Sequence, residues 1–382
     1  MSRLHRFCLA AAVLCAGLQH TAARAADPPS QPIKVSGLID WYYQIGLNSP
    51  PQGAGVGGRA FDLKQGTFAF NLAEANITKG VDARSPVGFT ATFTLGKTAD
   101  VVHLTEPGGT ADANYVNNTA GKYLQQLYAT MLIPGRTGAT LDVGKFVTHM
   151  GYEVIESSAN DNYSRGLLFT YAIPFYHAGL RLSAPLSPTL SGQLHVVNGW
   201  NNVEDDNAAK SLGLQLNWKP TSTVNVLLNY MGGMEGGKSL GSVNSGIGFP
   251  DTVERETHVI DLVGTMTPDA KTKLGFNIDR GTASAKGASG SWTGYALYAR
   301  RQFTATSALA ARWEHFEDPD GLRSGVGQNL SSITLTYEVA SPGSMLHRLE
   351  FRHDTAGTAF FAGANAASKN QDTLTFSQVY RF

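Results

Sequence analysis

The chain ends in Leu374-Thr-Phe376-Ser-Gln378-Val-Tyr380-Arg-Phe382, an alternating run that continues to a final aromatic residue. Alternation with a period of two is typical of a strand whose two faces meet different surroundings. The ends of globular chains usually fray into water. The last strand of a closed membrane barrel instead pairs with the first strand and turns every second side chain to lipid. This terminus therefore predicts a transmembrane β-barrel.

The other end of the chain, residues 1–25, has the pattern of a secretory leader. Arg3 and Arg6 supply the positive start, Phe7 to Leu18 form a twelve-residue apolar stretch, and Ala23-Arg24-Ala25 is an A-x-A cleavage motif. Twelve apolar residues are too few to span a bilayer. A cleaved leader joined to a barrel predicts a protein of the bacterial outer membrane, in contact with its lipid and lipopolysaccharide.

Composition narrows the class of protein further. Both cysteines, Cys8 and Cys15, lie in the leader, so the mature chain is expected to have no disulfide, thiolate metal site or cysteine nucleophile. Without the leader, 27 basic and 30 acidic residues remain, and this net charge of −3 gives no reason to expect a nucleic-acid partner. No linker or shift in composition divides residues 26–382, which predicts a single all-β domain and not a bundle of membrane helices.

Several segments alternate cleanly enough to be half-buried strands. Val87 to Leu95 carries Val, Phe, Ala, Phe and Leu on one face and Gly and Thr on the other. Ser211 to Lys219 places three leucines and a tryptophan on one face and polar side chains on the other. Apolar and polar residues alternate in the same way in Lys273 to Asp279 and in Arg348 to Asp354. A soluble β-sandwich would alternate too, so these segments alone do not identify the surrounding solvent.

The lengths of the connections distinguish the two possibilities. Short turns rich in Pro, Gly and Ser are expected near 82–86, 134–138, 187–189, 219–222, 267–271, 302–307 and 341–345. Longer polar loops are expected near 48–67, 98–121, 147–175, 199–209, 233–255, 281–290, 318–327 and 356–370. Such alternation is typical of outer-membrane barrels, which have short periplasmic turns and long extracellular loops. It predicts an antiparallel barrel of about sixteen strands, with fourteen or eighteen as alternatives.

Aromatic residues give weaker support. They could form the girdles that flank the membrane, or they could be ordinary side chains of a β core. The residues concerned are Trp41, Tyr42, Tyr43, Tyr128, Trp218, Tyr230, Trp292, Tyr295, Tyr298, Trp313, Tyr337 and Tyr380.

A barrel of about sixteen strands is too wide for side chains to fill, which predicts an aqueous channel. The longest connection, 147–175, is the best candidate to narrow it, because residues 166–173 are apolar enough to pack against a wall. We predict that this loop folds inward and that Glu153, Glu156 and Asp161 face basic wall residues, with Arg165 as a further constriction candidate. The basic candidates are Lys145, Arg181, Arg300, Arg312, Arg348 and Arg352. The alternative is an external loop whose charges face solvent.

One segment matches a nucleotide-binding motif. Gly232-Gly-Met-Glu-Gly-Gly-Lys-Ser239 satisfies the pattern G-x-x-x-x-G-K-[ST] and follows a predicted strand. A phosphate-binding loop must run into a helix whose N-terminus faces the phosphates. The following residues, Leu240 to Pro250, are too rich in glycine for that helix, so we interpret the match as a chance one and expect no cofactor.

Metal and catalytic motifs are weak as well. Asp205-Asp206-Asn207 and Glu317-Asp318-Pro-Asp320-Gly321 could hold a divalent ion but lack the spacing of a calcium loop, and solvated loop charge is the favoured interpretation. The ten histidines show no zinc-binding spacing. A serine nucleophile, such as Ser183 with His177 or His195, lacks a G-x-S-x-G motif. We predict that the protein is not an enzyme.

Several segments resemble the putative β-barrel porin-2 family of OmpL-like porins. They are Gly37 to Tyr43, Phe61-Asp62, Phe70 to Glu74, Asp142 to Glu153, Asn160 to Ser164, Pro174 to Arg181, Val197 to Asn201, Asp206-Asn207 and Lys210-Ser211. The resemblance covers most of the mature chain and is densest over 141–211. It implies an outer-membrane porin, transfers no catalytic residue, and is weakest in the loops 98–121 and 233–249.

The sequence thus predicts a passive diffusion pore for small hydrophilic solutes or ions. The alternative is a barrel whose loops occlude the lumen and which acts in surface binding or adhesion; an outer-membrane hydrolase is a third, weaker possibility. A homotrimer is a reasonable expectation because trimers are common among pores of this size. A net charge of −3 does not predict which ions pass.

Overall fold

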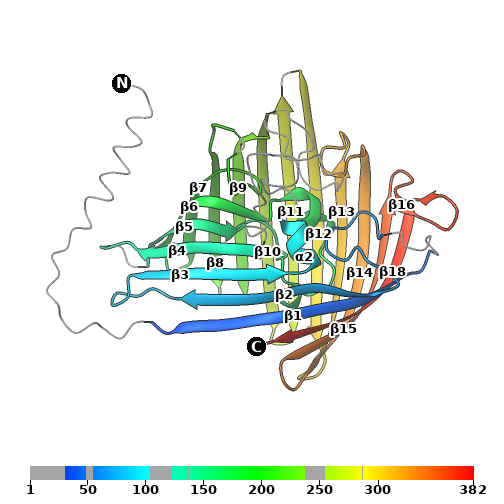
Figure 1. The fold of residues 1–382 in the computed structure, drawn as a ribbon, viewed down its shortest axis with the longest axis horizontal. Coiled ribbons are helices and arrows are strands. Elements are labelled where there is room, and N and C mark those ends of the chain that lie inside the picture. The colour runs from blue at the N-terminus through cyan, green and yellow to red at the C-terminus, as the bar shows by residue number, and fades with distance from the viewer. Residues whose placement is uncertain are drawn as a thin grey trace.

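The computed structural model describes residues 31–48, 55–103, 123–135, 138–205, 207–236, 254–285 and 287–382. They form a closed antiparallel barrel of sixteen strands (Figure 1). The predicted all-β fold and strand number are confirmed. The proposed leader lies outside the described residues. Among the helices that the structure describes, none combines the length and hydrophobicity that a transmembrane helix requires.

The barrel strands follow one another along the chain with a single interruption in the numbering. They are β1 (Ile33–Gly46), β2 (Phe68–Lys79), β3 (Val87–Leu95), β4 (Leu124–Leu132), β5 (Thr140–Val147), β6 (Tyr176–Ser187), β7 (Leu190–Val197), β8 (Ser211–Thr221), β9 (Val224–Glu235), β10 (Arg255–Asp269), β11 (Thr272–Ala285), β12 (Ala288–Gln302), β13 (Ser307–Asp318), β14 (Gln328–Ser341), β15 (Met345–Ala356) and β18 (Asn370–Arg381). A two-stranded hairpin, β16 (Phe361–Ala362) and β17 (Ala367–Ser368), lies in the last loop. Short helices are α2 (Lys97–Val102), η2 (Ser157–Ala159) and η3 (Leu168–Ala172).

The first and last strands close the barrel, as the C-terminal alternation predicts. β1 and β18 pair from Leu38 opposite Arg381 to Gly46 opposite Thr373. Gly37 and Phe382 exchange two backbone hydrogen bonds of 3.0 Å, which extends the pairing to the final residue. A side chain at Gly37 would not fit, because its Cβ atom would lie 2.2 Å from the Glu74 carbonyl oxygen.

Each strand has an apolar face directed outward and a polar face directed inward. On β8, Leu212, Leu214, Leu216 and Trp218 are 44–51% exposed, whereas Ser211 and Gly213, on the other face, are buried. The outward face of β3 runs Val, Phe, Ala, Phe, Leu, with Gly and Thr inward. An exposed apolar band around a sheet without edges is what lipid requires.

The connections alternate in length except between β11 and β12, and the predicted short turns all join successive strands on one side of the barrel. One predicted long loop, 281–290, is wrong. β11 continues to Ala285 and β12 starts at Ala288, so these strands extend beyond the expected boundary. Gly281 is a strand residue facing the Trp292 ring, and an added Cβ atom would lie 2.0 Å from that ring.

The aromatic residues divide between the two faces of the barrel. Trp41 packs against Phe68 and Phe376 on the outside, with ring centroids 5.7 and 5.8 Å apart. The outward set is Trp41, Tyr43, Trp218, Tyr230, Tyr295, Trp313, Tyr337 and Tyr380. The remaining four, Tyr42, Tyr128, Trp292 and Tyr298, face inward. The girdle and core interpretations therefore each hold for part of the set.

The largest apolar cluster lies inside the barrel, toward the long loops. It joins the β5–β6 connection to the β1–β2 loop, to α2 and to the inner wall. Its large members include Phe61, Val102, Leu167, Phe169, Phe175, Trp200, Trp292 and Phe316. Figure 1 shows α2 and the β5–β6 connection between the near and far strands. The extracellular half of the lumen is therefore largely filled by protein.

The two faces of β8 predict opposite responses to one charge. We expect Leu216→Arg to destabilise the barrel folded in bilayers by about 2–4 kcal/mol, because it places a guanidinium in lipid. Asn217→Arg should cost much less, because that side chain points into the lumen. Urea titrations of folding into lipid vesicles measure both variants. Equal costs would contradict the assignment of faces.

Candidate functional site

The connection between β5 and β6, residues 148–175, crosses the interior of the barrel. The Gly151 amide donates to Asp261 Oδ2 on β10 (2.7 Å), and the Ser157 hydroxyl donates to Asp40 Oδ2 on β1 (2.8 Å). The backbone amides at 163 and 164 donate to the Glu350 carboxylate on β15 at 2.6 and 3.0 Å. Since β1, β10 and β15 occupy different parts of the ring, the wall fixes this connection at several points. We call residues 148–175 the inner loop.

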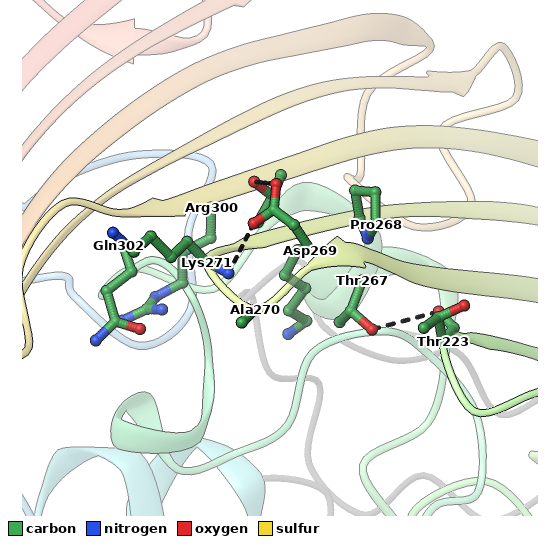
Figure 2. A pocket seen from close by; sticks show the side chains of 10 residues that line it. Thr223, Thr267, Pro268, Asp269, Ala270, Lys271, Arg300 and Gln302 are labelled. Carbon is green, nitrogen blue, oxygen red and sulfur yellow. Dashed lines mark hydrogen bonds between the residues drawn. The ribbon is translucent and has the colours of Figure 1, made fainter.

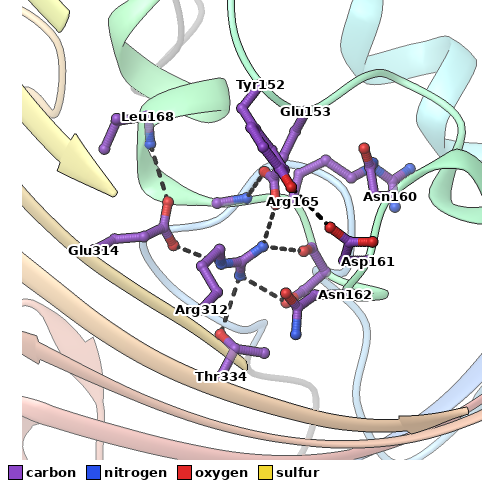
Figure 3. Close-up of polar contacts among 12 residues, drawn as sticks. Tyr152, Glu153, Asn160, Asp161, Asn162, Arg165, Leu168, Arg312, Glu314 and Thr334 are labelled. Carbon is purple, nitrogen blue, oxygen red and sulfur yellow. Dashed lines mark hydrogen bonds and ion pairs between the residues drawn. The ribbon is translucent and has the colours of Figure 1, made fainter. Parts of the chain in front are cut away.

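The strongest anchor of the inner loop is an ion pair between Glu153 and Arg312 on β13 (Figure 3). Arg312 Nη1 lies 2.5 Å from Glu153 Oε1, and its Nε lies 2.9 Å from Glu314 Oε2. The second Glu153 oxygen accepts the Gly166 amide at 2.5 Å. The Arg312 side chain is 0% exposed and that of Glu153 3%. A charge so buried depends on its partners, so this contact holds the loop to the wall.

Arg348 and Arg352 also hold the inner loop, but through its backbone. Arg348 donates to the Ser157 carbonyl at 2.6 Å and to the Asn160 carbonyl at 2.7 Å. Arg352 donates to the Arg165 carbonyl at 2.8 Å. Both arginines thus lie on the predicted wall beside the loop. Arg348 pairs with Glu338 on the neighbouring strand β14 and Arg352 with Asp354 on its own strand, and neither arginine pairs with the loop acids among the described contacts.

A more exposed contact joins the inner loop to β11. Lys273 Nζ lies 3.0 Å from Asp161 Oδ2, and Tyr152, stacked on Tyr298 at 3.8 Å, donates to the same oxygen at 2.9 Å. Burial, reinforced by the Asp161 carboxylate, raises the pKa of Tyr152 well above its usual value, so its hydroxyl remains a donor. The Lys273 side chain is 37% exposed. Sequence reasoning placed Lys273 on the polar face of its strand but missed it as a partner of Asp161.

Glu156 meets another carboxyl group instead of a cation. Gln125 on β4 donates to Glu156 Oε1 at 2.6 Å, and Glu156 shares a side-chain hydrogen bond with Glu74 on β2. Both glutamates remain partly exposed. Sequence reasoning missed Glu74, whose position on the inner face of β2 was the available signal.

Arg165 points into the loop cluster. It donates to the Tyr163 carbonyl at 3.0 Å and to Thr98 Oγ1 at 3.2 Å, and its guanidinium stacks over the Phe61 ring at 4.6 Å. Its relative exposure is 1%. Arg165 therefore joins the inner loop to α2 and the β1–β2 loop, a contact that its position in sequence does not reveal.

The other basic candidates are Arg181, Arg300 and Lys145. Arg181 pairs with Asp142 at 2.8 Å and Arg300 with Glu338 at 2.8 Å, both inside the barrel and both partly exposed. Lys145 instead stacks over the Tyr176 ring at 4.3 Å. Lys145 is the register partner of Leu127 on β4, which faces outward. Lys145 is three positions from the inward Asp142, so it lies on the opposite face of β5. The expectation that Lys145 faces the loop acids is wrong for that reason.

A second anchor, absent from the sequence-based candidates, lies in the β1–β2 loop. Arg59 pairs with Asp62 at 2.7 Å and with Asp354 on β15 at 2.6 Å, and it donates to Thr373 on β18 at 2.9 Å. The side chains of both ion pairs are at most 3% exposed. This network pins a second loop inside the barrel beside its closing strands.

Exposure changes along the lumen. Inward residues level with the inner loop are buried, as the Arg312 and Asp40 side chains show. Nearer the short turns, inward polar residues such as Gln193 and Asn217 are partly exposed. This periplasmic part of the lumen is accessible to water, and water can satisfy its polar groups.

Two groups of accessible ionisable side chains lie across the lumen from each other. Lys273 and Arg300 lie on β11 and β12, whereas Glu74 lies on β2, across the ring of strands, with Glu156 beside it. Opposed basic and acidic groups in a narrow passage create a field across it.

The remaining motifs have structural explanations. Gly232 to Glu235 of the nucleotide-like match belong to strand β9, and 237–253 lie outside the described residues. Asp318 accepts backbone amides at 322, 323 and 324, so it caps a turn. Asp205 pairs with Lys210, whereas Asp206 lies outside the described residues. The described chain brings no three His, Cys, Asp or Glu side chains together as a metal site.

The serine–histidine pair that the sequence analysis disfavoured is not formed in the described contacts. His195 Nε2 contacts Gln193 Oε1 at 3.1 Å, and His177 contacts the Gly199 carbonyl at 3.0 Å and Thr148 at 3.2 Å. Ser183 is the register partner of Gln193. The two histidines thus bond to groups other than Ser183.

The two loop–wall ion pairs predict different consequences when their cations are removed. Arg312→Gln should destabilise the docked loop by about 3–5 kcal/mol, because it leaves buried carboxylates without a counter-charge. Lys273→Gln should cost about 0.2–1 kcal/mol, because that pair is partly exposed. Ala172→Cys provides a reporter, since Ala172 is 0% exposed and residues 26–382 contain no cysteine. Maleimide should label Cys at position 172 quickly when Ala172→Cys is combined with Arg312→Gln and slowly when it is combined with Lys273→Gln. Equal labelling rates would contradict the anchoring role of Arg312.

Comparison with solved structures shows porin folds. The anion-selective porin from Comamonas acidovorans has a TM-score of 0.63 at 9% identity, covering 92% of this chain and 99% of that one. The trimer form of OmpT, an outer membrane protein of Vibrio cholerae, has 0.58 at 11%, covering 92% and 99%. Salmonella typhi OmpF, in complex with daunomycin, has 0.58 at 11%, covering 92% and 98%. At these identities the likeness concerns the fold.

No curated protein matches the chain. The family model described as putative beta-barrel porin-2, OmpL-like, matches residues 32–382, which is nearly the whole barrel. The family match confirms the resemblance noted in the sequence. The chain belongs to the putative beta-barrel porin-2, OmpL-like family and is an outer-membrane porin, a diffusion channel.

Proposed function

We propose that the inner loop forms the constriction of this channel and that solutes pass along its accessible periplasmic face. One observation carries the proposal: the loop is fixed to the wall by the buried Glu153–Arg312 pair, while the contacts at Lys273 and Glu156 remain partly exposed. A fixed obstacle beside accessible charges has the elements of a selective passage.

The arrangement of charge suggests how the passage acts on solutes. Lys273 and Arg300 lie on one side and Glu74 and Glu156 on the other. Because this field acts in a narrow space between low-dielectric walls, it orients water and polar solutes more strongly than it would in bulk water. The proposed selection is therefore for small polar or charged solutes over apolar ones.

Conductance of the mature chain, residues 26–382, tests the channel directly. Residues 1–25 are omitted because we propose that they are removed on export. The refolded protein in a planar bilayer should give stable current steps that increase in proportion to bulk salt. A folded barrel that never conducts would contradict an open passage.

The acidic side of the passage predicts a change in ion preference. Glu74→Gln together with Glu156→Gln should shift the reversal potential under a salt gradient toward anions, because it removes carboxyl groups from one wall only. Glu256→Gln with Glu317→Gln is the matched control, since these two glutamates lie on the outward faces of β10 and β13. The same shift in both double variants would assign it to overall charge and not to the passage.

The packed loops favour a second candidate function. The apolar cluster fills much of the lumen at the level of Phe169 and Trp292. A barrel closed in this way would present its loops for surface binding or adhesion. Conductance separates the two functions, because a closed barrel folds without producing current steps.

We also propose that the protein assembles as a homotrimer. The short strands β3, β4 and β5 form a low wall whose outward residues on β3 and β4 are all apolar. One matched structure of a Vibrio cholerae outer membrane protein is a trimer form, which supports this assembly for the fold. A low apolar wall suits contact with a second copy at least as well as contact with lipid.

The trimer proposal predicts sensitivity at one wall only. Ala129→Trp, on the outward face of β4, should convert trimer to monomer, because a bulky ring prevents close approach of a second wall. Ala299→Trp, outward on β12 across the barrel, is the control and should leave the assembly unchanged. Light scattering of the detergent-solubilised protein gives the mass. A monomeric unsubstituted protein would contradict the proposal.

A further inference from the structure

A pocket of about 390 Å³ lies at the periplasmic end of the lumen, under the turn between β10 and β11 (Figure 2). The turn contributes Pro268 to Lys271, and the neighbouring strands contribute Thr267, Lys273, Arg300 and Gln302. Lys273 and Arg300 are register partners on β11 and β12, so their side chains start from adjacent positions on the inner wall. The pocket is thus built by covalently adjacent strands and not by a mobile loop.

Three of the residues that line this pocket carry a positive charge, and its single carboxylate is already committed elsewhere. Asp269 accepts the Lys271 amide at 2.7 Å and the Thr272 hydroxyl at 2.9 Å. It also pairs at 2.8 Å with Arg301, which is not among the pocket residues. The pocket therefore presents the charges of Lys271, Lys273 and Arg300 without a free carboxylate of its own.

The carboxylates beside the pocket only partly balance these charges. Lys273 pairs with Asp161, and Arg300 pairs with Glu338. Glu338 is shared, because Arg348 also pairs with it at 2.8 Å.

Lys271 is the exposed member of the set, and no ion pair of this residue occurs among the described contacts. Four cations, those of the pocket and Arg348, thus face the two carboxylates of Asp161 and Glu338. The wall around the pocket retains a net positive charge.

We infer that this pocket binds a small solute anion that carries a phosphate group or two carboxylates. A guanidinium matches the paired oxygens of both groups, and two ammonium groups add charge without demanding one geometry. Thr267 and Gln302 add neutral polar side chains at the rim. The site would raise the local concentration of such anions at the periplasmic mouth. The inference rests on the proposed channel function only for its role, since binding itself requires no current.

Binding is measured first, by calorimetric titration of the folded mature chain in an uncharged detergent at low salt. The probes are sodium phosphate and sodium succinate, added separately to distinguish phosphate from dicarboxylate recognition. We expect Lys271→Gln to raise the dissociation constant about fivefold, as expected for the loss of one exposed charge pair. Arg300→Gln should raise it at least about tenfold, because hydrogen bonds to a charged group are lost.

The matched control is Lys34→Gln. Lys34 is exposed on the inner face near the periplasmic end of β1, outside the pocket. Its substitution therefore removes an equal charge from the same end of the barrel. Its dissociation constant should stay that of the unsubstituted protein. Binding of neither probe, or equal weakening by Lys271→Gln and Lys34→Gln, would overturn the inference.

Conductance then separates this inference from the proposed function. Phosphate or succinate should reduce the chloride current of the unsubstituted channel. The Lys271→Gln channel should need a higher concentration of either anion for the same reduction. Current steps without such inhibition would contradict an anion site in the path while leaving the channel intact. Binding without any current would keep the site and contradict the open passage.

Discussion

Backbone hydrogen bonding in lipid is the constraint on which this structure depends. A strand with free N–H and C=O groups cannot remain in hydrocarbon, so the sheet must close on itself. The pairing of β1 with β18, extended to Phe382 by its exchange with Gly37, meets this demand at the seam. Closure in turn dictates an outward apolar face, an inward polar face and alternating turns and loops. These patterns dominate the chain because every strand must satisfy the same condition.

Closure also leaves an interior that the inner loop partly fills. A sixteen-stranded ring encloses more space than wall side chains can fill, and the chain fills part of it with its own loops. Charged side chains of the loops and of the wall are then buried together, which is tolerable only when each charge has a partner. Arg312 between Glu153 and Glu314, and Arg59 between Asp62 and Asp354, are the result. Charges of this kind position the loop, whereas the accessible charges near Lys273 are free to act on solutes.

The features set by a two-residue period could be predicted from sequence, and those set by tertiary contacts could not. The strands, the turns and the inward direction of Arg312 follow from alternation. The same rule, applied to β5, shows that Lys145 points away from Asp142, so that error was avoidable. Lys273 and Glu74 were missed because pairing across a lumen depends on the path of a loop, which has no period. The length of the β11–β12 hairpin was missed because Gly281 accommodates the Trp292 ring within a strand, and only Gly287 lies in the turn.

The lumen is asymmetric along its axis, and this asymmetry connects the loops to the transport of solutes. Its extracellular half contains an apolar cluster held by buried ion pairs, whereas its periplasmic half is lined by partly exposed polar groups. A solute entering from the periplasmic side would meet the cationic wall of β11 and β12 before it reached the proposed constriction. Because electrostatic attraction weakens with distance and salt, a charge at the mouth affects capture more than a charge buried behind the loop. Selection and narrowing are therefore assigned to different residues, and each can vary without dismantling the other.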